Sequence, residues 1–343
     1  MLTFNNTSHD PFYNQAFEEY VFDTFREDDM LFLWRNSPAV VVGCSQNICR
    51  EVSVPALRRS HIPVVRRISG GGTVYHDLGN INYTYIKSVD GLPDYGDCIR
   101  PVTEALNSLG IPAHQNGVCD IAIADKKISG SAQRVVKDRV LHHGTLLYSC
   151  DLGVLDGLTT FGKNDCFKTK GTLSAISSVA NISDYIKNPM SVEDFRSALA
   201  EKLLPSDCKT VELTAEQAAE VEKLRDEKYK SREWTWGTTP PFVYEKTSVY
   251  RDEPIYVSYK AKKGIVSDAV VESPWLDGAL ASALMNGSFL CPEVFEDIGL
   301  NSPMTKTENF SAFLCELKIA TVPFERKYIP WKKKSKCRNC VPK

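Results

Sequence analysis

The sequence predicts an α/β or α+β protein, and three observations support that prediction. Of the 343 residues, 43% are hydrophobic and 24% are charged, which is typical of a globular protein. In the first part of the chain, short apolar runs typical of strands are interspersed with segments whose apolar residues have helical spacing. At about 100–200 residues per domain, this length favours two domains.

Helices and strands are expected to alternate from the N-terminus. Apolar residues at helical spacing predict an amphipathic helix over residues 13–25, with Glu18 beside its apolar stripe and Glu19 directed away from it. A second helix is expected over residues 99–109, where Gly110 ends it. Apolar runs predict strands at residues 31–34, 39–43, 63–68, 73–76, 80–86 and 144–149, and a hairpin of residues 119–124 with 127–129.

The later part of the chain contains the expected domain boundary. Patterns resembling capping boxes begin at Ser191 and Thr214 and predict two helices, of which the second continues to about residue 230. Residues 234–242 are rich in turn residues and cannot form one regular element. We therefore expect one domain at residues 1–245 and another at residues 246–343. The second domain is expected to be β-rich first (255–260, 264–271) and then helical (276–285).

Composition and charge exclude several classes of protein. The last twelve residues contain six Lys or Arg and no acid, so the remainder has 35 basic and 43 acidic residues, a net charge of −8. General nucleic-acid binding is excluded, because it needs a positive face. No apolar run approaches the roughly 18 residues of a membrane span. No Lys or Arg precedes Arg26, and the chain has eleven cysteines, so we expect a cytoplasmic protein with reduced thiols.

A glycine-rich segment is the strongest local motif. Gly70, Gly71 and Gly72 lie between two predicted strands and follow Arg66 and Arg67. Consecutive glycines permit positive φ and leave backbone N–H groups open to an anion, while arginine suits phosphate or carboxylate. The spacing matches neither a Walker A loop nor a dinucleotide-binding fingerprint. Taken alone, the motif fits a glycine-rich hairpin with solvated arginines equally well.

A lysine motif follows at residues 127–134. Lys127 precedes a run of small residues, Ser129 to Ala132, so a ligand could lie against the chain beside a cation. A single lysine is far more often a solvated surface charge, and we expect adjacent Lys126 to be one.

Taken together, these motifs resemble the lipoate–protein ligase family of the biotin/lipoate ligase superfamily. The resemblance implies a catalytic domain built on a mixed sheet flanked by helices, followed by a small α+β accessory domain. It covers most of the first domain and is carried by residues 14–19, 33–35, 42–47, 67–80, 127–134, 142–147, 170–174 and 234–237.

The resemblance also implies a reaction and its partners. Lipoate would attack ATP to give lipoyl-AMP and pyrophosphate, and the lipoyl group would pass to the ε-amine of an acceptor lysine. The implied acceptors are lipoyl domains of 2-oxoacid dehydrogenase E2 subunits and the glycine-cleavage H protein.

The same resemblance assigns roles to residues of this chain. Lys127 would lie against the α-phosphate and the lipoyl carbonyl oxygen, and Arg67 beside the lipoyl carboxyl end. Asp120 would help to hold Mg²⁺ or the nucleotide. The adenylate would be lined by Gly72, Thr73, Val74 and Tyr75, and the lipoyl pocket by Glu18, Ser69, His76, Arg134 and His143.

Two alternatives remain open. Cys119 stands where the ligases usually carry Asn, and related amidotransferases form a thioester on a cysteine without ATP. Their cysteine lies further upstream of the lysine motif, so Cys119 fits better as a buried thiol. The chain could also be a non-catalytic protein that binds a lipoyl carrier. A preference for lipoate over octanoate cannot be read from the sequence.

The basic C-terminus contains one Cys-x-x-Cys pair, Cys337 and Cys340. A structural zinc site needs four ligands, and a redox pair usually opens a helix of a βαβ unit. We therefore expect neither there and interpret the tail as a solvated end.

Overall fold

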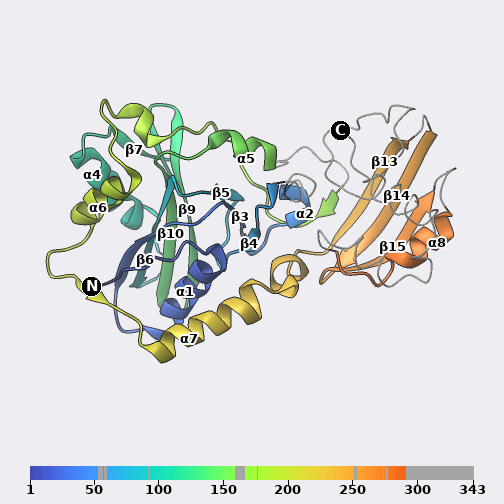
Figure 1. Cartoon of the computed structure of the whole chain (residues 1–343), viewed down its shortest axis with the longest axis horizontal. Helices are drawn as coiled ribbons and strands as arrows, with labels where there is room; N and C mark the ends of the chain where they lie inside the picture. The colour runs from blue at the N-terminus through green and yellow to red at the C-terminus, as the bar shows by residue number, and fades with distance from the viewer. Residues whose placement is uncertain are drawn as a thin grey trace. The chain divides into compact units, whose positions relative to one another are not determined.

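A computed structural model describes residues 1–52, 57, 60–91, 93–158, 167–175, 177–250, 253–272, 274 and 277–290 (Figure 1). The chain forms two compact units, each built from separate segments. The first comprises residues 1–44, 62–156 and 174–231, and the second comprises residues 45–61, 157–173 and 232–343.

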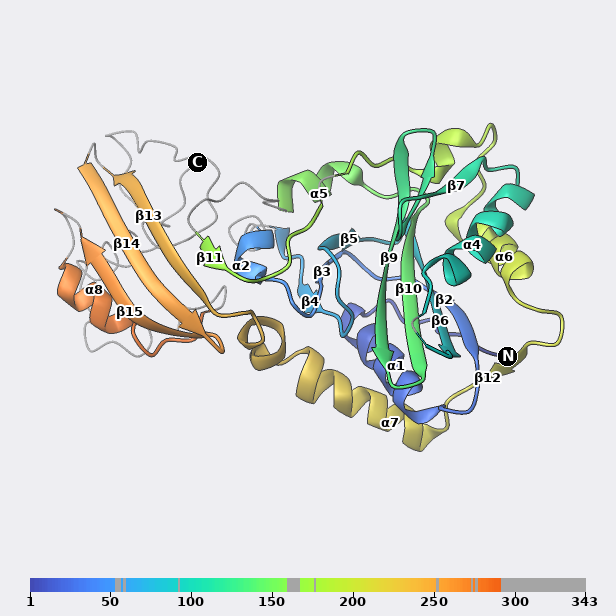
Figure 2. The ribbon, with the colours of Figure 1, turned by 180° about the vertical axis from the view of Figure 1, so that it is seen from behind.

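An eight-stranded sheet forms the centre of the first unit. Strand β1 (Leu2–Phe4) pairs parallel with both of its neighbours, whereas the remaining pairs are antiparallel, so the sheet is mixed. The long strands β9 and β10 lie side by side, as Figure 2 shows. The order across the sheet is β12 (Lys209–Val211), β1, β2 (Met30–Trp34), β6 (Asn80–Ser88), β10 (Arg139–Leu147), β9 (Lys126–Val136), β8 (Asp120–Ile123) and β7 (Ala113–Asn116).

A three-stranded sheet in the same unit carries the glycine-rich segment. Its central strand β3 (Ala39–Val42) pairs parallel with β4 (Val64–Arg66) and antiparallel with β5 (Val74–His76). Because β4 and β5 flank β3, the connecting residues 67–73 must cross the end of β3. We call these residues the glycine loop.

Three helices of the first unit begin at polar caps. Helix α1 (Pro11–Thr24) begins at Asp10, whose side chain accepts the Phe12 N–H at 2.9 Å, and α7 (Ala215–Leu224) begins with the expected capping box at Thr214. Helix α6 (Val192–Leu203) begins at Ser191, whose hydroxyl accepts the Asp194 N–H. The unit also contains α4 (Gly96–Ser108), the 3₁₀ turn η1 (Ile182–Tyr185), the π-helical turn η2 (Arg225–Tyr229) and most of α5 (Leu152–Leu158).

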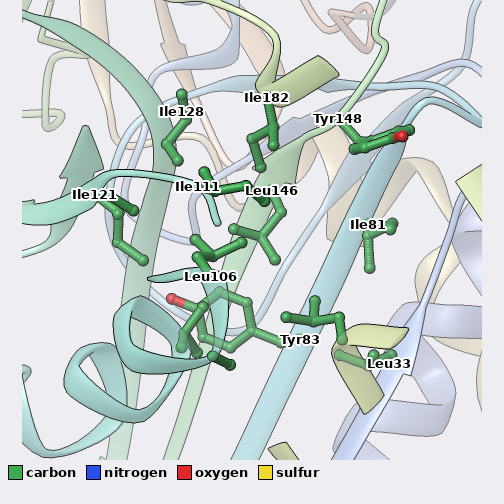
Figure 3. Packing of buried hydrophobic residues seen from close by; sticks show 14 of the residues in the cluster. Leu33, Ile81, Tyr83, Leu106, Ile111, Ile121, Ile128, Leu146, Tyr148 and Ile182 are labelled. Atoms are coloured by element: carbon green, nitrogen blue, oxygen red, sulfur yellow. The ribbon is translucent and has the colours of Figure 1, made fainter. Parts of the chain in front are cut away.

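The main core lies between the large sheet and helices α4 and α6 (Figure 3). Leu106 of α4 packs with Tyr83, Ile121 and Leu146 from three strands, and all four side chains are fully buried. Tyr148 stacks on Phe195 of α6 with ring centroids 4.2 Å apart. Burying such side chains contributes about 1.5–3 kcal/mol each, so this core fixes the strands that carry the lysine motif.

The second unit contains a four-stranded antiparallel sheet. The order is β11-β13-β14-β15, and helix α8 (Gly278–Met285) follows with Asp277 as its N-cap. The π-helical turn η3 (Glu233–Gly237) precedes β13, and the short helix α2 (Ile48–Glu51) belongs to the same unit. The strands span β11 (Phe167–Thr169), β13 (Phe242–Tyr250), β14 (Glu253–Lys262) and β15 (Ile265–Glu272).

The prediction of the fold class is confirmed, and the differences concern element ends and short elements that were not predicted, such as β1, β7 and β12. Helix α4 starts at Gly96 rather than at residue 99, and β10 starts at Arg139 rather than at residue 144. Residues 234–242 do include two elements, η3 and the start of β13. A boundary at 245/246 falls inside β13, and the division into domains 1–245 and 246–343 stays a prediction.

Two further expectations concern cysteines and membranes. The described cysteines Cys44, Cys49, Cys98, Cys119, Cys150 and Cys208 are free thiols. Cys337, Cys340 and the rest of the basic tail lie outside the described residues. Within the described ranges, no helix has the length and apolar character that crossing a membrane requires.

Candidate functional site

The glycine loop is shaped by the Arg67 side chain. Its Nη2 donates to the carbonyl oxygens of Gly70 at 2.5 Å and Gly72 at 2.7 Å, while Nη1 donates to the Val41 carbonyl at 3.3 Å. Nε donates to the Ser69 hydroxyl at 3.0 Å. Arg67 is 5% exposed, and burial lowers the pKa of its guanidinium to about 10, so the group stays charged at neutral pH. A single buried cation therefore binds two carbonyl groups of the loop and one of β3.

Glycine is required at two points around this loop. Gly71 has φ +86°, and a Cβ atom there would lie 2.9 Å from Arg67 Nη2 and 3.3 Å from Ala132 Cβ. A Cβ atom at Gly43, just after β3, would lie 2.5 Å from the Gly71 carbonyl oxygen. The loop thus packs against the end of β3 and against β9, where the lysine motif lies.

The backbone of the loop presents hydrogen-bond donors. The N–H groups of Gly70, Gly71 and Gly72 donate to no atom of the described residues, whereas the Thr73 N–H donates to Ser174 Oγ at 2.7 Å. Consecutive backbone N–H groups that are left open in a glycine-rich turn form an anion-binding surface. Thr73 and Tyr75 are buried, and burial raises the pKa of Tyr75 to about 12.

Behind the loop lies a chain of buried polar side chains. Ser69 Oγ and His143 Nε2 are 2.7 Å apart, and His143 Nδ1 is 3.0 Å from Glu18 Oε1. Thr84 Oγ1 donates to the same carboxylate at 2.6 Å, and Gln15 Nε2 donates to Oε2 at 3.1 Å. The structure thus brings Glu18, Ser69 and His143 together with Arg67.

Lys127 is the open cation of the site. Its Nζ lies 2.9 Å from Asp120 Oδ1, and the two side chains are 26% and 21% exposed. Gly130 makes room for it, because a Cβ atom at that position would lie 2.9 Å from Lys127 Nζ. The backbone N–H of Lys127 donates to the Ser178 carbonyl, and its carbonyl accepts the Ala180 N–H. The side chain can therefore move while its base stays fixed.

Lys126 differs from its neighbour, as expected. Its Nζ binds Ser178 Oγ at 2.8 Å and lies 3.7 Å from Asp125, and its side chain is 39% exposed. It has no contact with Asp120 among the described residues.

Cys119 lies beside the ion pair but is a poor nucleophile. Its Sγ donates to Asp120 Oδ1 at 3.4 Å, and its pKa is raised by burial and by the Asp120 charge. Since the thiolate is the nucleophilic form, this environment favours a structural thiol. Its carbonyl accepts both the N–H and the hydroxyl of Ser131 at 2.8 Å, which fixes β9 beside it.

Two histidines are buried in the neutral form. Burial, together with the charges of Arg67 and His143, lowers the pKa of His76 to about 3. Asn36 Nδ2 donates to its Nδ1 at 3.0 Å, and its Nε2 has no partner among the described residues. His142, which the sequence did not single out, also has a pKa lowered to about 3 by burial. It stacks on Tyr83 with ring centroids 5.9 Å apart.

Arg134 links β9 to the glycine loop. Its Nη1 donates to the Ile68 carbonyl at 3.3 Å, and the side chain is half-buried. Residues that sequence reasoning missed are Gln15, Asn36, Thr84 and Ser174, which bind the predicted ones. A polar residue on an apolar strand was the available signal for Thr84.

The described residues do not form a resident metal centre. Among them, no three His, Cys, Asp or Glu side chains lie close enough to hold a metal ion. Asp120 is a single carboxylate whose Oδ1 already binds Lys127 and Cys119. Mg²⁺ commonly binds through one carboxylate plus substrate phosphates and water. The donor set therefore fits an ion that arrives with a nucleotide.

Comparisons with known proteins give a consistent result. Residues 10–204 match the model of the family described as lipoyl protein ligase A/B catalytic domain. The chain is 32% identical over 298 residues to lipoate–protein ligase 1 of Staphylococcus aureus, covering 86% of this chain and 90% of the relative.

Two solved structures are also similar. One is described as a bi-partite lipoate protein ligase and its E2 lipoyl domain from Thermoplasma acidophilum, at TM-score 0.57 and 25% identity, covering 69% of this chain and 96% of that chain. The other is lipoate-protein ligase A bound with ATP, at TM-score 0.54 and 26% identity, covering 69% of this chain and 97% of that chain.

Proposed function

The chain belongs to the lipoyl protein ligase A/B catalytic family and is a lipoate–protein ligase, and we propose how its residues carry out the reaction. A carboxylate oxygen of lipoate attacks the α-phosphorus of ATP, the bond to pyrophosphate breaks, and lipoyl-AMP forms. The ε-amine of an acceptor lysine then attacks the acyl carbon, AMP leaves, and the amine loses a proton to solvent. Neither step needs a nucleophile from the enzyme.

The single observation that carries this proposal is that Lys127 lies on β9, the strand that packs against the glycine loop at Ala132. Both steps move negative charge between oxygen atoms, so catalysis rests on positioning and charge stabilisation. The loop supplies open N–H groups, and β9, on which Lys127 lies, packs against the loop at Ala132. The structure therefore combines backbone donors and a mobile cation in one unit.

Lys127 is proposed as the catalytic residue, in contact with the α-phosphate and the lipoyl carbonyl oxygen. Two unit charges at 4 Å interact by about 1 kcal/mol in water and about 4 kcal/mol at an effective dielectric near 20. A half-exposed lysine therefore becomes effective when the bound substrates displace water. To reach them, Lys127 Nζ has to break its ion pair with Asp120 or interact with that carboxylate and the substrates at the same time.

The other site residues have supporting roles in the proposal. Gly72, Thr73, Val74 and Tyr75 line the adenylate, and Arg134 lies between the loop and the lipoyl pocket. Glu18, Ser69, His76 and His143 form the buried wall of that pocket behind Arg67. What supports this arrangement is that these side chains come from four elements and meet around one loop.

Mg²⁺ would enter with ATP and be held by Asp120 and the phosphates. When bound, it neutralises phosphate charge. Asp120 meanwhile orients Lys127 through the bond at 2.9 Å.

The proposed acceptors are lipoyl domains of E2 subunits, with the glycine-cleavage H protein as a second acceptor. The similarity to a Thermoplasma acidophilum ligase described together with its E2 lipoyl domain supports the first. We also propose that residues 1–245 are catalytic and residues 246–343 accessory. A cytoplasmic location is supported by the free thiols among the described cysteines.

Lipoate-dependent exchange of pyrophosphate into ATP tests the proposal. The ligase predicts exchange that requires lipoate. An amidotransferase predicts no exchange and capture of an acyl group on a cysteine, which the raised pKa of Cys119 disfavours. A carrier-binding protein predicts neither. Absence of exchange in folded protein would overturn the proposal.

A further inference from the structure

Four polar side chains behind the glycine loop are connected in series. Glu18 binds His143, His143 binds Ser69, and Ser69 accepts from Arg67. Each of these side chains belongs to a residue at most 8% exposed. Arg67 then donates to the carbonyls of Gly70 and Gly72. The series thus runs from helix α1 through strand β10 to the loop that faces the substrates.

The direction of the hydrogen bonds is set by Glu18. A carboxylate only accepts, so His143 Nδ1 carries a proton towards Glu18, and this ring orientation places Nε2 2.7 Å from the Ser69 hydroxyl oxygen. Ser69 Oγ in turn accepts from Arg67 Nε at 3.0 Å. The carboxylate is itself held by Thr84 and Gln15.

The hydrogen-bonding groups of these side chains are occupied by other groups of the protein. Glu18 accepts from three side chains, both ring nitrogens of His143 have partners, and Ser69 both donates and accepts. These groups have little left to offer a ligand. Their visible effect is on the shape of the loop, where the carbonyls of Gly70 and Gly72 accept from Arg67 while the N–H groups of Gly70, Gly71 and Gly72 donate to no described atom.

We propose that Glu18 and His143 are positioning residues, which act through Ser69 and Arg67 to hold the glycine loop in its anion-binding shape. That the anion is the adenylate rests on the proposed function. The arrangement of the loop in the free protein does not depend on it.

Hydrogen exchange of the loop amides in the substrate-free protein tests the proposal. Glu18→Gln places an amide where three donors converge, and Ser69→Ala removes only the link to Arg67. Both variants should speed exchange at the hydrogen-bonded loop amides of Arg67 and Thr73, which donate to the Val42 carbonyl and to Ser174 Oγ, by about tenfold or more, the change expected when one charge-assisted hydrogen bond is lost. Glu19→Gln is the matched control, because Glu19 lies on the same helix but binds Lys228 and Tyr229. It should leave loop exchange unchanged.

Kinetics provide a readout that a merely structural effect would not give. If the groups act in series, the Glu18→Gln/Ser69→Ala double variant loses no more of kcat/KM for exchange than the more impaired single variant. If each group contacts lipoate independently, the losses multiply.

The outcomes separate the two proposals. Unchanged loop exchange in both single variants, or multiplying kinetic losses, would overturn the positioning role. If the variants show faster hydrogen exchange in the loop but the wild-type protein shows no pyrophosphate exchange, the positioning role is retained and the ligase mechanism is overturned. Should Glu18→Gln fail to fold, Ser69→Ala alone still decides the loop measurement.

Discussion

Two positively charged groups of the candidate site differ in their burial and in the partners that they bind. Arg67 is 5% exposed and donates to the carbonyls of Gly70 and Gly72, whereas the Lys127 side chain is 26% exposed and forms an ion pair with Asp120. A buried cation with fixed partners shapes the backbone around it. A partly exposed cation with one partner can turn towards a ligand and form an ion pair with it. We therefore expect Arg67 to contribute mainly to stability, and we propose that Lys127 contributes to the chemistry.

Lys127→Ala should separate the two roles most strongly. Removing a charge that stabilises a transition state costs about 10²–10³-fold in kcat, so lipoate-dependent pyrophosphate exchange should fall at least that far. The free energy of unfolding should change by less than about 1 kcal/mol, since an ion pair that solvent still reaches contributes little. Lys126→Ala is the control and should retain activity within about twofold. Near-normal exchange by Lys127→Ala would contradict its assigned role.

Arg67→Ala should show the reverse, a large loss of stability. The substitution leaves the carbonyls of Gly70, Gly72 and Val41 without their donor. Each unsatisfied buried group costs about 1–3 kcal/mol, so the free energy of unfolding should fall by about 3 kcal/mol or more. Urea denaturation measures this. A loss below about 1 kcal/mol would show that the loop does not depend on the guanidinium.

Gly71→Ala should disturb the contact between loop and arginine. Its left-handed backbone costs about 1–2 kcal/mol for a residue with a Cβ atom, and that atom would lie 2.9 Å from Arg67 Nη2. Gly110→Ala is a matched control with φ +81° and nothing within 4 Å. Denaturation of both variants isolates the cost of the close contact. Equal losses would mean that Arg67 moves aside freely.

Acid should destabilise the buried side of the site through His76 and His142. Both have a pKa of about 3 when folded, against 6.5 as the ordinary value. Between these values the unfolded chain binds more protons, so stability falls as pH falls. From pH 7.5 to 5.5 the loss should be about 1.4 kcal/mol per histidine. His76→Gln should reduce this combined loss by about half, as measured by urea titrations at the two pH values. If the variant keeps the full pH dependence of stability, His76 takes up protons in the folded state.

The sequence predicted much of the fold, because apolar periodicity is strong in the strands and helices that form the core. It underestimated β9, which extends to Val136, because Gly130, Ser131, Gln133 and Arg134 carry no apolar signal. The pairing of residues 131–136 with β10 arises from backbone hydrogen bonds that side-chain patterns do not reveal.

The sequence named several residues that the structure brings together, but it did not predict the hydrogen bonds among them. Glu18 stood out beside the apolar stripe of its helix, yet its bond to His143, 125 positions away in the chain, depends on tertiary packing. His142 and His143 are adjacent on β10 and enter different environments, against Tyr83 and Glu18 respectively. Alternation along a strand explains that separation. Arg67 binds carbonyl groups of its own loop because of the backbone conformation of that loop. Glycine permits many backbone conformations, so the sequence does not predict this one.

The most direct test of the account is the mass of an E2 lipoyl domain after incubation with this protein, lipoate and ATP. The account predicts one lipoyl group on one lysine, formed only with ATP and accompanied by AMP and pyrophosphate, and lost in Lys127→Ala but retained in Lys126→Ala. Modification without ATP, or undiminished modification by Lys127→Ala, would contradict it.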